Sequence, residues 1–115
     1  MVIQLFSSGT MDYSVGALRL LEMTHTSGQE LLTRHVQGDW GNFGSYQATE
    51  ISQGDRRMAG GKFPHRQNKL NKLAIDNCQG RVWSEYEIGN QKIWLITESI
   101  EVRGPVTRLL LPGED

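Results

Sequence analysis

Two runs of strand-forming residues with a two-residue gap between them constrain the fold of this chain more than any other feature. The runs are RVWSEYEI at 81–88 and QKIWLITE at 91–98, and both are rich in β-branched and aromatic residues. The gap holds Gly89 and Asn90, a dipeptide typical of a tight hairpin turn. The sequence therefore predicts an antiparallel β-hairpin in the last third of the chain.

Two further runs predict additional strands. VTRLLL at 106–111 is ended by Pro112-Gly113 and extends the hairpin into a C-terminal β-meander. VIQLF at 2–6 is a short apolar run followed by Ser-Ser-Gly, which indicates a strand and a turn near the N-terminus.

Both faces of the expected sheet carry apolar side chains. Along 91–98, Ile93 and Leu95 fall on one face, whereas Trp94 and Ile96 fall on the other. Either helices cover one face and a long loop covers the other, or one face is a subunit interface. Trp83 on the adjacent strand adds a second tryptophan, and we therefore keep a homodimer as a hypothesis.

Two segments flanking the middle of the chain have the spacing of amphipathic helices. In 14–24 an apolar stripe follows Ser14, which is a candidate N-cap. In 65–80 helical spacing returns before Gly80. The residues that share one side of this later helix are Leu70, Leu73, Ala74 and Asn77.

A third helix is predicted between them. Glu30 lies three residues after Ser27, as in a capping box. Arg34 and His35 fall in the last turn, where cations suit the negative end of the helix dipole. Gly38 is a natural left-handed stop, so this helix ends inside the sequence RHVQGDWG.

Together these elements predict an α+β fold, with about three helices packed on one face of a small, mostly antiparallel sheet of three to four strands. A chain of 115 residues with 37% hydrophobic and 22% charged residues is typical of one globular domain, here 1–115. From about 42 to 64 the chain is rich in glycine, serine, glutamine and charge. We expect a mobile or functional loop there.

Charge and composition exclude several classes of function. A formal net charge of -1 gives no global basic field, which argues against sequence-independent DNA binding as the main activity. A single cysteine, Cys78, excludes an intramolecular disulfide and a multi-cysteine zinc site. Neither a secretion signal nor an apolar stretch near the roughly twenty residues of a membrane span is found. We expect a cytoplasmic protein that does not enter a membrane.

The sequence RHVQGDWG at 34–41 has two interpretations. His35 and Asp39 could converge as a metal pair or an acid–base pair. A third metal ligand would come from a residue at no recognised spacing: His65, Glu98 or Glu101. In the structural interpretation, which we favour, His35 stabilises the helix end, Asp39 accepts backbone N–H groups and Trp40 fills the core. We predict no metal and no cofactor.

Glu98, at the end of the second hairpin strand, is the other candidate for chemistry. With His35 it could form a carboxylate–imidazole couple that acts as a general base. The alternative, again favoured, is an ion pair with Arg103 or Arg81 on a neighbouring strand.

The segment DRRMAGGKFPHR at 55–66 concentrates positive charge around two glycines. Such a segment could bind phosphate or single-stranded nucleic acid. The GGK triplet does not follow a strand with Walker spacing, so a nucleotide-binding P-loop is not supported. A solvated loop is the favoured interpretation.

Taken in order, GALRLLEMTHTSGQELLTRHVQGDWG, NKLAIDNCQGRVWSEY, KIWLITES and LLLP resemble a family of small bacterial proteins, often carried on plasmids or mobile elements. The RH-x-x-GDWG and WLITE sequences are the specific parts of this resemblance, which spans about 14–113. Some members carry a label as a subunit of a type I restriction enzyme. This chain lacks the length and the glycine-rich motif of a methyltransferase.

Two departures from the family pattern stand out. The 42–68 loop is longer, and the Asp-Arg pair that follows ITE in the family is replaced here by SIEVRGP, with Glu101 and Arg103 as candidate substitutes.

The resemblance implies an architecture rather than an activity, so whether the chain is an enzyme stays open. Our leading hypothesis is an accessory interaction module of mobile-element type that binds a protein partner through the RHxxGDWG turn and the adjacent loop. The binding candidates are Trp40, Arg56, Arg57, Lys62, Arg66 and Arg103. The alternatives are a small hydrolytic or metal-dependent enzyme using His35, Asp39 and Glu98, and nucleic-acid binding by the basic segment 55–72.

Overall fold

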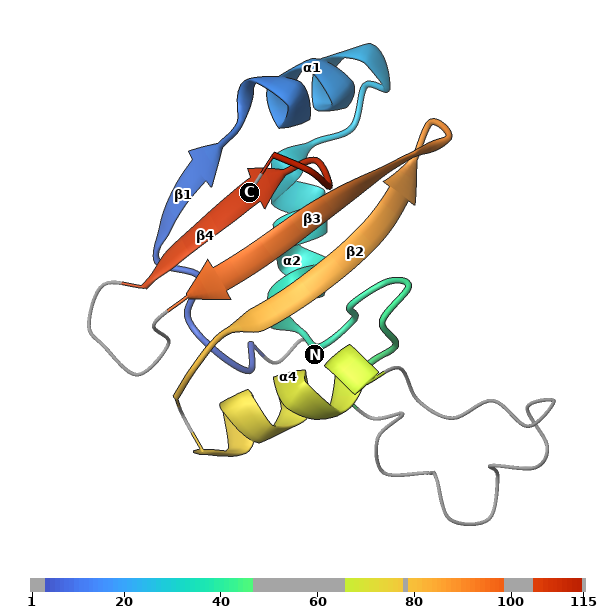
Figure 1. The fold of residues 1–115 in the computed structure, drawn as a ribbon. Helices are drawn as coiled ribbons and strands as arrows, with labels where there is room; N and C mark the ends of the chain where they lie inside the picture. The colour runs from blue at the N-terminus through green and yellow to red at the C-terminus, as the bar shows by residue number, and fades with distance from the viewer. Residues whose placement is uncertain (1–3, 47–65, 78, 99–104, 115) are drawn as a thin grey trace, which may run out of the picture.

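The computed structural model describes residues 4–46, 66–77, 79–98 and 105–114. This part of the chain confirms the α+β prediction, with three helices and a four-stranded mixed sheet (Figure 1). The elements in chain order are β1 (Thr10–Tyr13), α1 (Val15–Met23), α2 (Gly28–Val36), α4 (Arg66–Asn77), β2 (Val82–Ile88), β3 (Gln91–Glu98) and β4 (Val106–Leu110).

The sheet has the strand order β1-β4-β3-β2. Strands β2, β3 and β4 form the predicted antiparallel meander, and β1 adds to it by pairing in parallel with β4. At the hairpin, Gly89 and Asn90 have φ angles of 54° and 71°, as a turn of the I′ type requires at both central positions. The predicted antiparallel hairpin is therefore confirmed.

The strand predicted near the N-terminus is misplaced. Residues 4–6 are not in a strand, and 2–3 lie outside the described residues. Leu5 donates its N–H to the carbonyl of Val36 at 2.7 Å, so this segment runs beside the end of α2. The strand forms instead at Thr10–Tyr13. A short apolar run can pack against a helix as well as in a sheet, and periodicity does not separate the two.

Local capping explains where the first two helices begin. The hydroxyl of Ser14 accepts the N–H of Ala17 at 2.9 Å, and the Ser27–Glu30 capping box is present. After α2, Gly38 adopts a φ of 91°, which ends the helix as predicted.

Helix α4 also forms where it was expected, but it turns a different side toward the protein. Leu70 and Leu73 are 45% and 56% exposed, whereas the buried residues of α4 are Asn68, Asn71 and Ala74. The apolar spacing located the helix but not its buried face.

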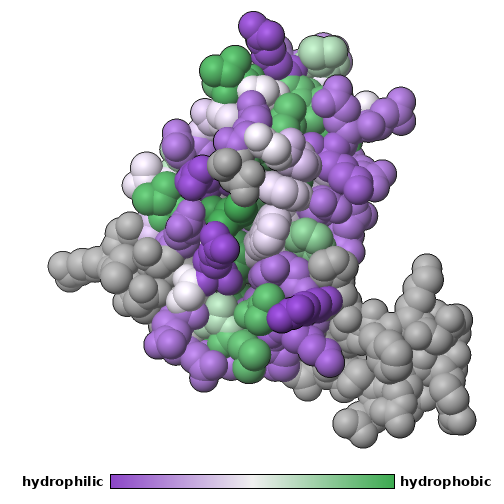
Figure 2. Space-filling view, in the orientation of Figure 1, coloured by the Kyte–Doolittle hydropathy of each residue, from purple (hydrophilic) through white to green (hydrophobic). Residues whose placement is uncertain are grey.

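The two faces of the sheet have different surroundings. Helix α2 lies behind the sheet, with α1 and α4 toward opposite ends (Figure 1). Figure 2 shows the other face, where polar side chains surround small apolar groups. There Trp83 and Trp94 lie half-buried and edge to face, with ring centroids 4.8 Å apart. The loop expected to cover this face falls largely outside the described residues.

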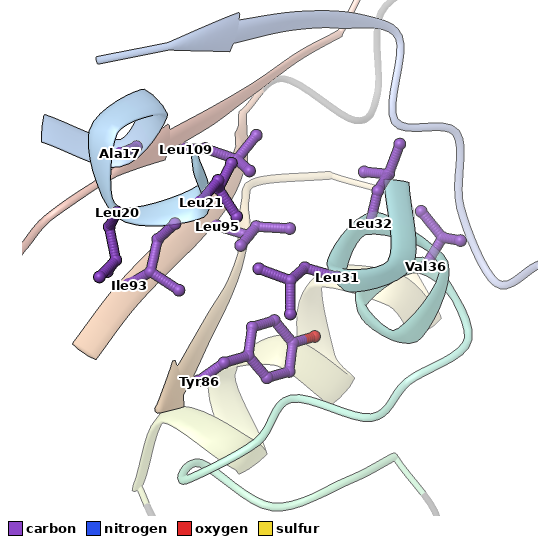
Figure 3. Close-up of a cluster of buried hydrophobic side chains, with 10 residues drawn as sticks. All are labelled: Ala17, Leu20, Leu21, Leu31, Leu32, Val36, Tyr86, Ile93, Leu95 and Leu109. Atoms are coloured by element: carbon purple, nitrogen blue, oxygen red, sulfur yellow. The ribbon is translucent and has the colours of Figure 1, made fainter. Parts of the chain in front are cut away.

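The main core lies between the sheet and the first two helices (Figure 3). Its buried members are Ala17, Leu20, Leu21, Leu31, Leu32, Val36, Tyr86, Ile93, Leu95 and Leu109. A second cluster joins Trp40 and Phe43 to Ala74 and Val82 beneath α4. Within the described ranges, no helix is long and apolar enough to cross a membrane.

Candidate functional site

The sequence RHVQGDWG forms the end of α2 and a closed turn. Arg34 Nε donates to Asp39 Oδ2 at 2.7 Å, and Asp39 Oδ1 accepts the N–H of Gly41 at 3.2 Å. The Arg34 guanidinium also lies 4.4 Å from the centre of the Tyr86 ring. Partial burial alone would raise the pKa of Asp39, but the hydrogen bonds from Arg34 and Gly41 hold it below its usual value. Asp39 thus serves the turn as the structural interpretation predicts.

His35 does not serve the helix end, as that interpretation had assumed, because its side chain is fully buried beneath the sheet. Its Nδ1 lies 2.6 Å from the hydroxyl of Ser84, and its Nε2 lies 2.8 Å from the hydroxyl of Thr97. The ring of Phe6 meets it edge-on, with centroids 5.1 Å apart. His35 therefore joins α2 to β2 and β3 through polar contacts inside the core.

The protons in this chain of contacts can be assigned from its far end. Thr107 donates to the carbonyl of Ser8 at 2.7 Å, so its oxygen accepts the proton of Thr97, 2.6 Å away. Thr97 has then used its only proton and must accept from Nε2–H of His35. Ser84 in turn donates to Nδ1. The assignment satisfies a neutral imidazole at both nitrogens, and burial lowers the pKa of His35 to about 3.

Trp40 and its neighbours seal one edge of the sheet. Strand β2 is the outermost strand on this side, and an edge strand exposes unpaired main-chain groups. Glu85 donates its N–H to the carbonyl of Trp40 at 3.2 Å and accepts the N–H of Asn42 at 2.7 Å. Between them Gly41, with a φ of 64°, sits against β2 so closely that a Cβ would collide with the carbonyl of Glu85. The indole of Trp40 is fully buried, so as folded it offers no surface to a partner.

The same edge is closed one step further along by a side chain of α4. Asn71 Oδ1 accepts the N–H of Trp83 at 2.9 Å, and Asn71 Nδ2 donates to the carbonyl of Trp83 at 2.8 Å. The neighbouring Asn68 donates to the carbonyl of Ser45 at 2.7 Å and so ties α4 to the turn. This is why the buried side of α4 is polar. The sequence carries this signal as two asparagines three residues apart, Asn68 and Asn71, which the spacing of apolar residues does not detect.

Glu98 lies on the face of the sheet opposite His35. Successive side chains of a strand alternate, and because Thr97 points to His35, Glu98 points away. It forms an ion pair with Arg108 at 3.2 Å across the β3–β4 pair. An ion pair with a neighbouring strand is therefore present, and its described partner is Arg108, which the sequence did not single out; Arg103 lies outside the described residues.

The candidate catalytic residues thus occupy separate environments. His35 is inside the core, Asp39 is in the half-exposed turn, and Glu98 is on the outer face. Among the described residues, no three histidine, cysteine, aspartate or glutamate side chains come together in a way that could hold a metal ion. Polar core residues that the sequence analysis did not single out are Ser84, Thr97 and Thr107.

The basic binding candidates are mostly not described. Arg66 is exposed and begins α4. The remaining ones, Arg56, Arg57, Lys62 and Arg103, lie outside the described residues. The same holds for His65 and Glu101.

The fold and the turn define a small α+β domain whose most distinctive sequence seals a sheet edge. Comparison of this chain with protein-family models, curated proteins and solved structures finds no match.

Proposed function

We propose that this chain is a protein-binding accessory module, and that a groove between α4 and β2 is its binding surface. The observation that carries the proposal is the exposure of Leu70 and Leu73, at 45% and 56%, beside a hollow of about 390 Å³. Figure 2 shows an apolar patch at the lower end of the molecule, over α4. The lining residues are Gln67, Leu70, Leu73, Ala74, Asn77, Gln79, Gly80, Arg81 and Trp83.

The chemistry of the groove favours one kind of partner. Arg81 is the one charged residue among the described lining residues. Arg66 and Lys69 are exposed on α4, which forms one side of the groove. Two aliphatic side chains flanked by cations suit a peptide segment that brings apolar side chains and carboxylates. We therefore propose an acidic, amphipathic segment of another protein as the occupant.

In this proposal the RHxxGDWG turn does not touch the partner; the chain that follows it supports one wall of the groove. Phe43, two residues after this turn, packs edge to face against Trp83 with centroids 5.5 Å apart, and Trp83 forms one wall of the groove. We further propose, on the resemblance to plasmid- and mobile-element-borne proteins alone, that the module is an accessory protein of mobile DNA. The proposed binding surface is therefore the groove at α4 instead of the RHxxGDWG turn, while the proposed class of function is still an accessory interaction module.

A displayed library of random peptides, selected on the full chain, tests the proposal. Enriched peptides should carry spaced aliphatic side chains with acidic neighbours. Burial of one leucine is worth about 1.5–3 kcal/mol, so the double variant Leu70→Asp/Leu73→Asp should bind these peptides at least about tenfold more weakly.

Leu18→Asp is the matched control, because Leu18 is an equally exposed leucine, at 52%, on α1. It should bind the peptides as the unaltered chain does. Circular dichroism of each variant confirms that it folds. If no peptide is enriched, or if the double variant binds as well as the control, the groove is not the binding surface.

A further inference from the structure

The two edge strands of the sheet, β2 and β1, differ in how far their outward main-chain groups are paired with other parts of the chain. Asn71 and the Trp40–Asn42 segment pair with the main-chain groups of Trp83 and Glu85 on the edge of β2. At the other edge β1 is the outermost strand, and in Figure 1 no labelled helix or strand lies beyond it. Along this second edge, two of the four strand residues have main-chain groups for which no partner is found among the described residues.

The groups concerned belong to Met11 and Tyr13. Thr10 donates its N–H to the carbonyl of Pro105, just before β4, at 3.0 Å, and Ser14 donates its N–H to the carbonyl of Leu109 in β4 at 2.8 Å. Because main-chain groups alternate along a strand, those of Met11 and Tyr13 point away from β4. Such an edge is a template for another extended chain.

We propose that β1 pairs in antiparallel fashion with β1 of a second copy of this chain, joining two four-stranded sheets into one continuous sheet. The contact is a two-fold one, in which the same edge serves both copies. It is separate from the groove at α4, which lies at the opposite edge of the sheet.

The side chains of β1 select one register for this pairing. Met11 and Tyr13 must stay on the inner face, where they pack against the core, so a symmetric pairing is centred on Met11 or on Asp12. Centring on Asp12 sets two carboxylates directly opposite each other, which is destabilising. Centring on Met11 avoids this and aims the outward N–H and C=O of each Met11 at the other.

The register centred on Met11 is also complementary on the outer face. It sets Thr10 of each copy opposite Asp12 of the other, and both side chains are exposed there. A threonine hydroxyl can donate to the carboxylate, and this pair occurs twice. A second copy further brings a strand that is already ordered, whereas a free peptide would lose its conformational freedom on a four-residue edge.

Charge substitutions at Thr10 test the register. Thr10→Lys places a cation opposite each Asp12, and Thr10→Glu places a like charge there. A directly opposed pair is worth roughly 0.2–1 kcal/mol and counts twice, so the dimer dissociation constant should fall about two- to thirtyfold with lysine and rise by a similar factor with glutamate. Sedimentation equilibrium from micromolar to submillimolar protein measures both.

Amide hydrogen exchange locates the contact within the dimer. The N–H of Met11 should exchange more slowly as the protein concentration rises, whereas the N–H of Asp12, which faces β4, should not change. A chain that stays monomeric over the whole concentration range overturns the proposal. So does a dimer in which the two Thr10 variants behave alike or Met11 is unaffected, because the interface then lies elsewhere.

Discussion

Lowering the pH from about 7 to about 5 should weaken the fold because of His35. The folded protein holds this ring neutral between Ser84 and Thr97, with its pKa lowered by burial from 6.5 to about 3. In the unfolded chain the ring binds a proton near its ordinary pKa of about 6.5. Between these two values the unfolded state holds one more proton, so stability falls as the pH falls.

The size of the effect follows from the two pKa values. Each pH unit between them costs about 1.4 kcal/mol, so the step from 6.5 to 5 costs about 2 kcal/mol and the full window about 5 kcal/mol. Domains of this kind are stable by about 5–15 kcal/mol in total. The pKa of Asp39 is also lowered, and its contribution is lost only at lower pH. The upper part of the window therefore reports mainly on His35.

Urea unfolding followed by tryptophan fluorescence at about pH 7, 6 and 5 measures this loss, since Trp40 is buried in the folded state. His35→Gln is the matched variant because it keeps a polar side chain without a titrating ring. It should be less stable at neutral pH, and its disadvantage should shrink by about 2 kcal/mol toward pH 5. A constant difference between the two proteins, or an NMR titration of the folded His35 ring near pH 6.5, would refute the reasoning.

Two further substitutions test the seal on the β2 edge by urea unfolding. Gly41→Ala should cost at least about 3 kcal/mol because it adds a clash with the strand to the strain of a positive φ, whereas Gly80→Ala, with its nearest neighbour at 3.7 Å, should cost only about 1 kcal/mol. Equal losses would show that the close approach at Gly41 is unimportant. Asn71→Ala should cost about 2–4 kcal/mol through two lost hydrogen bonds to Trp83, while the exposed Asn77→Ala should change stability by less than about 0.5 kcal/mol. If Asn71→Ala does not change the free energy of unfolding, the β2 edge is held by other contacts.

The parts of the fold that could be predicted are those specified by residues close together in sequence. The Ser27–Glu30 capping box, the stop at Gly38 and the Gly89-Asn90 turn each act within a few positions. The same locality explains the meander, because two strands joined by a two-residue turn have little choice but to pair.

The site could be predicted only in part, because most of its residues come together only in the tertiary fold. Asp39 could be assigned to the turn because its partners, Arg34 and Gly41, are near neighbours. His35 could not be placed, because the side chains that hold it are 49 and 62 positions away. For the same reason Glu98 was considered as its partner, although the pleat turns it to the opposite face.

The amino-acid sequence alone set the class of fold, the ends of the first two helices and the hairpin register, since local backbone preferences and caps suffice for these. Only the tertiary structure determined that Thr10–Tyr13 pairs in parallel with β4, that α4 buries its polar side, and which contacts the residues of RHVQGDWG make. Asn71 of α4 and the Trp40–Asn42 segment meet main-chain groups of β2 that need partners, a requirement that exists only once the sheet has formed. In RHVQGDWG, the histidine turns inward because the folded sheet brings the hydroxyls of Ser84 and Thr97 to its two ring nitrogens, and the tryptophan and glycine that follow cover part of the β2 edge.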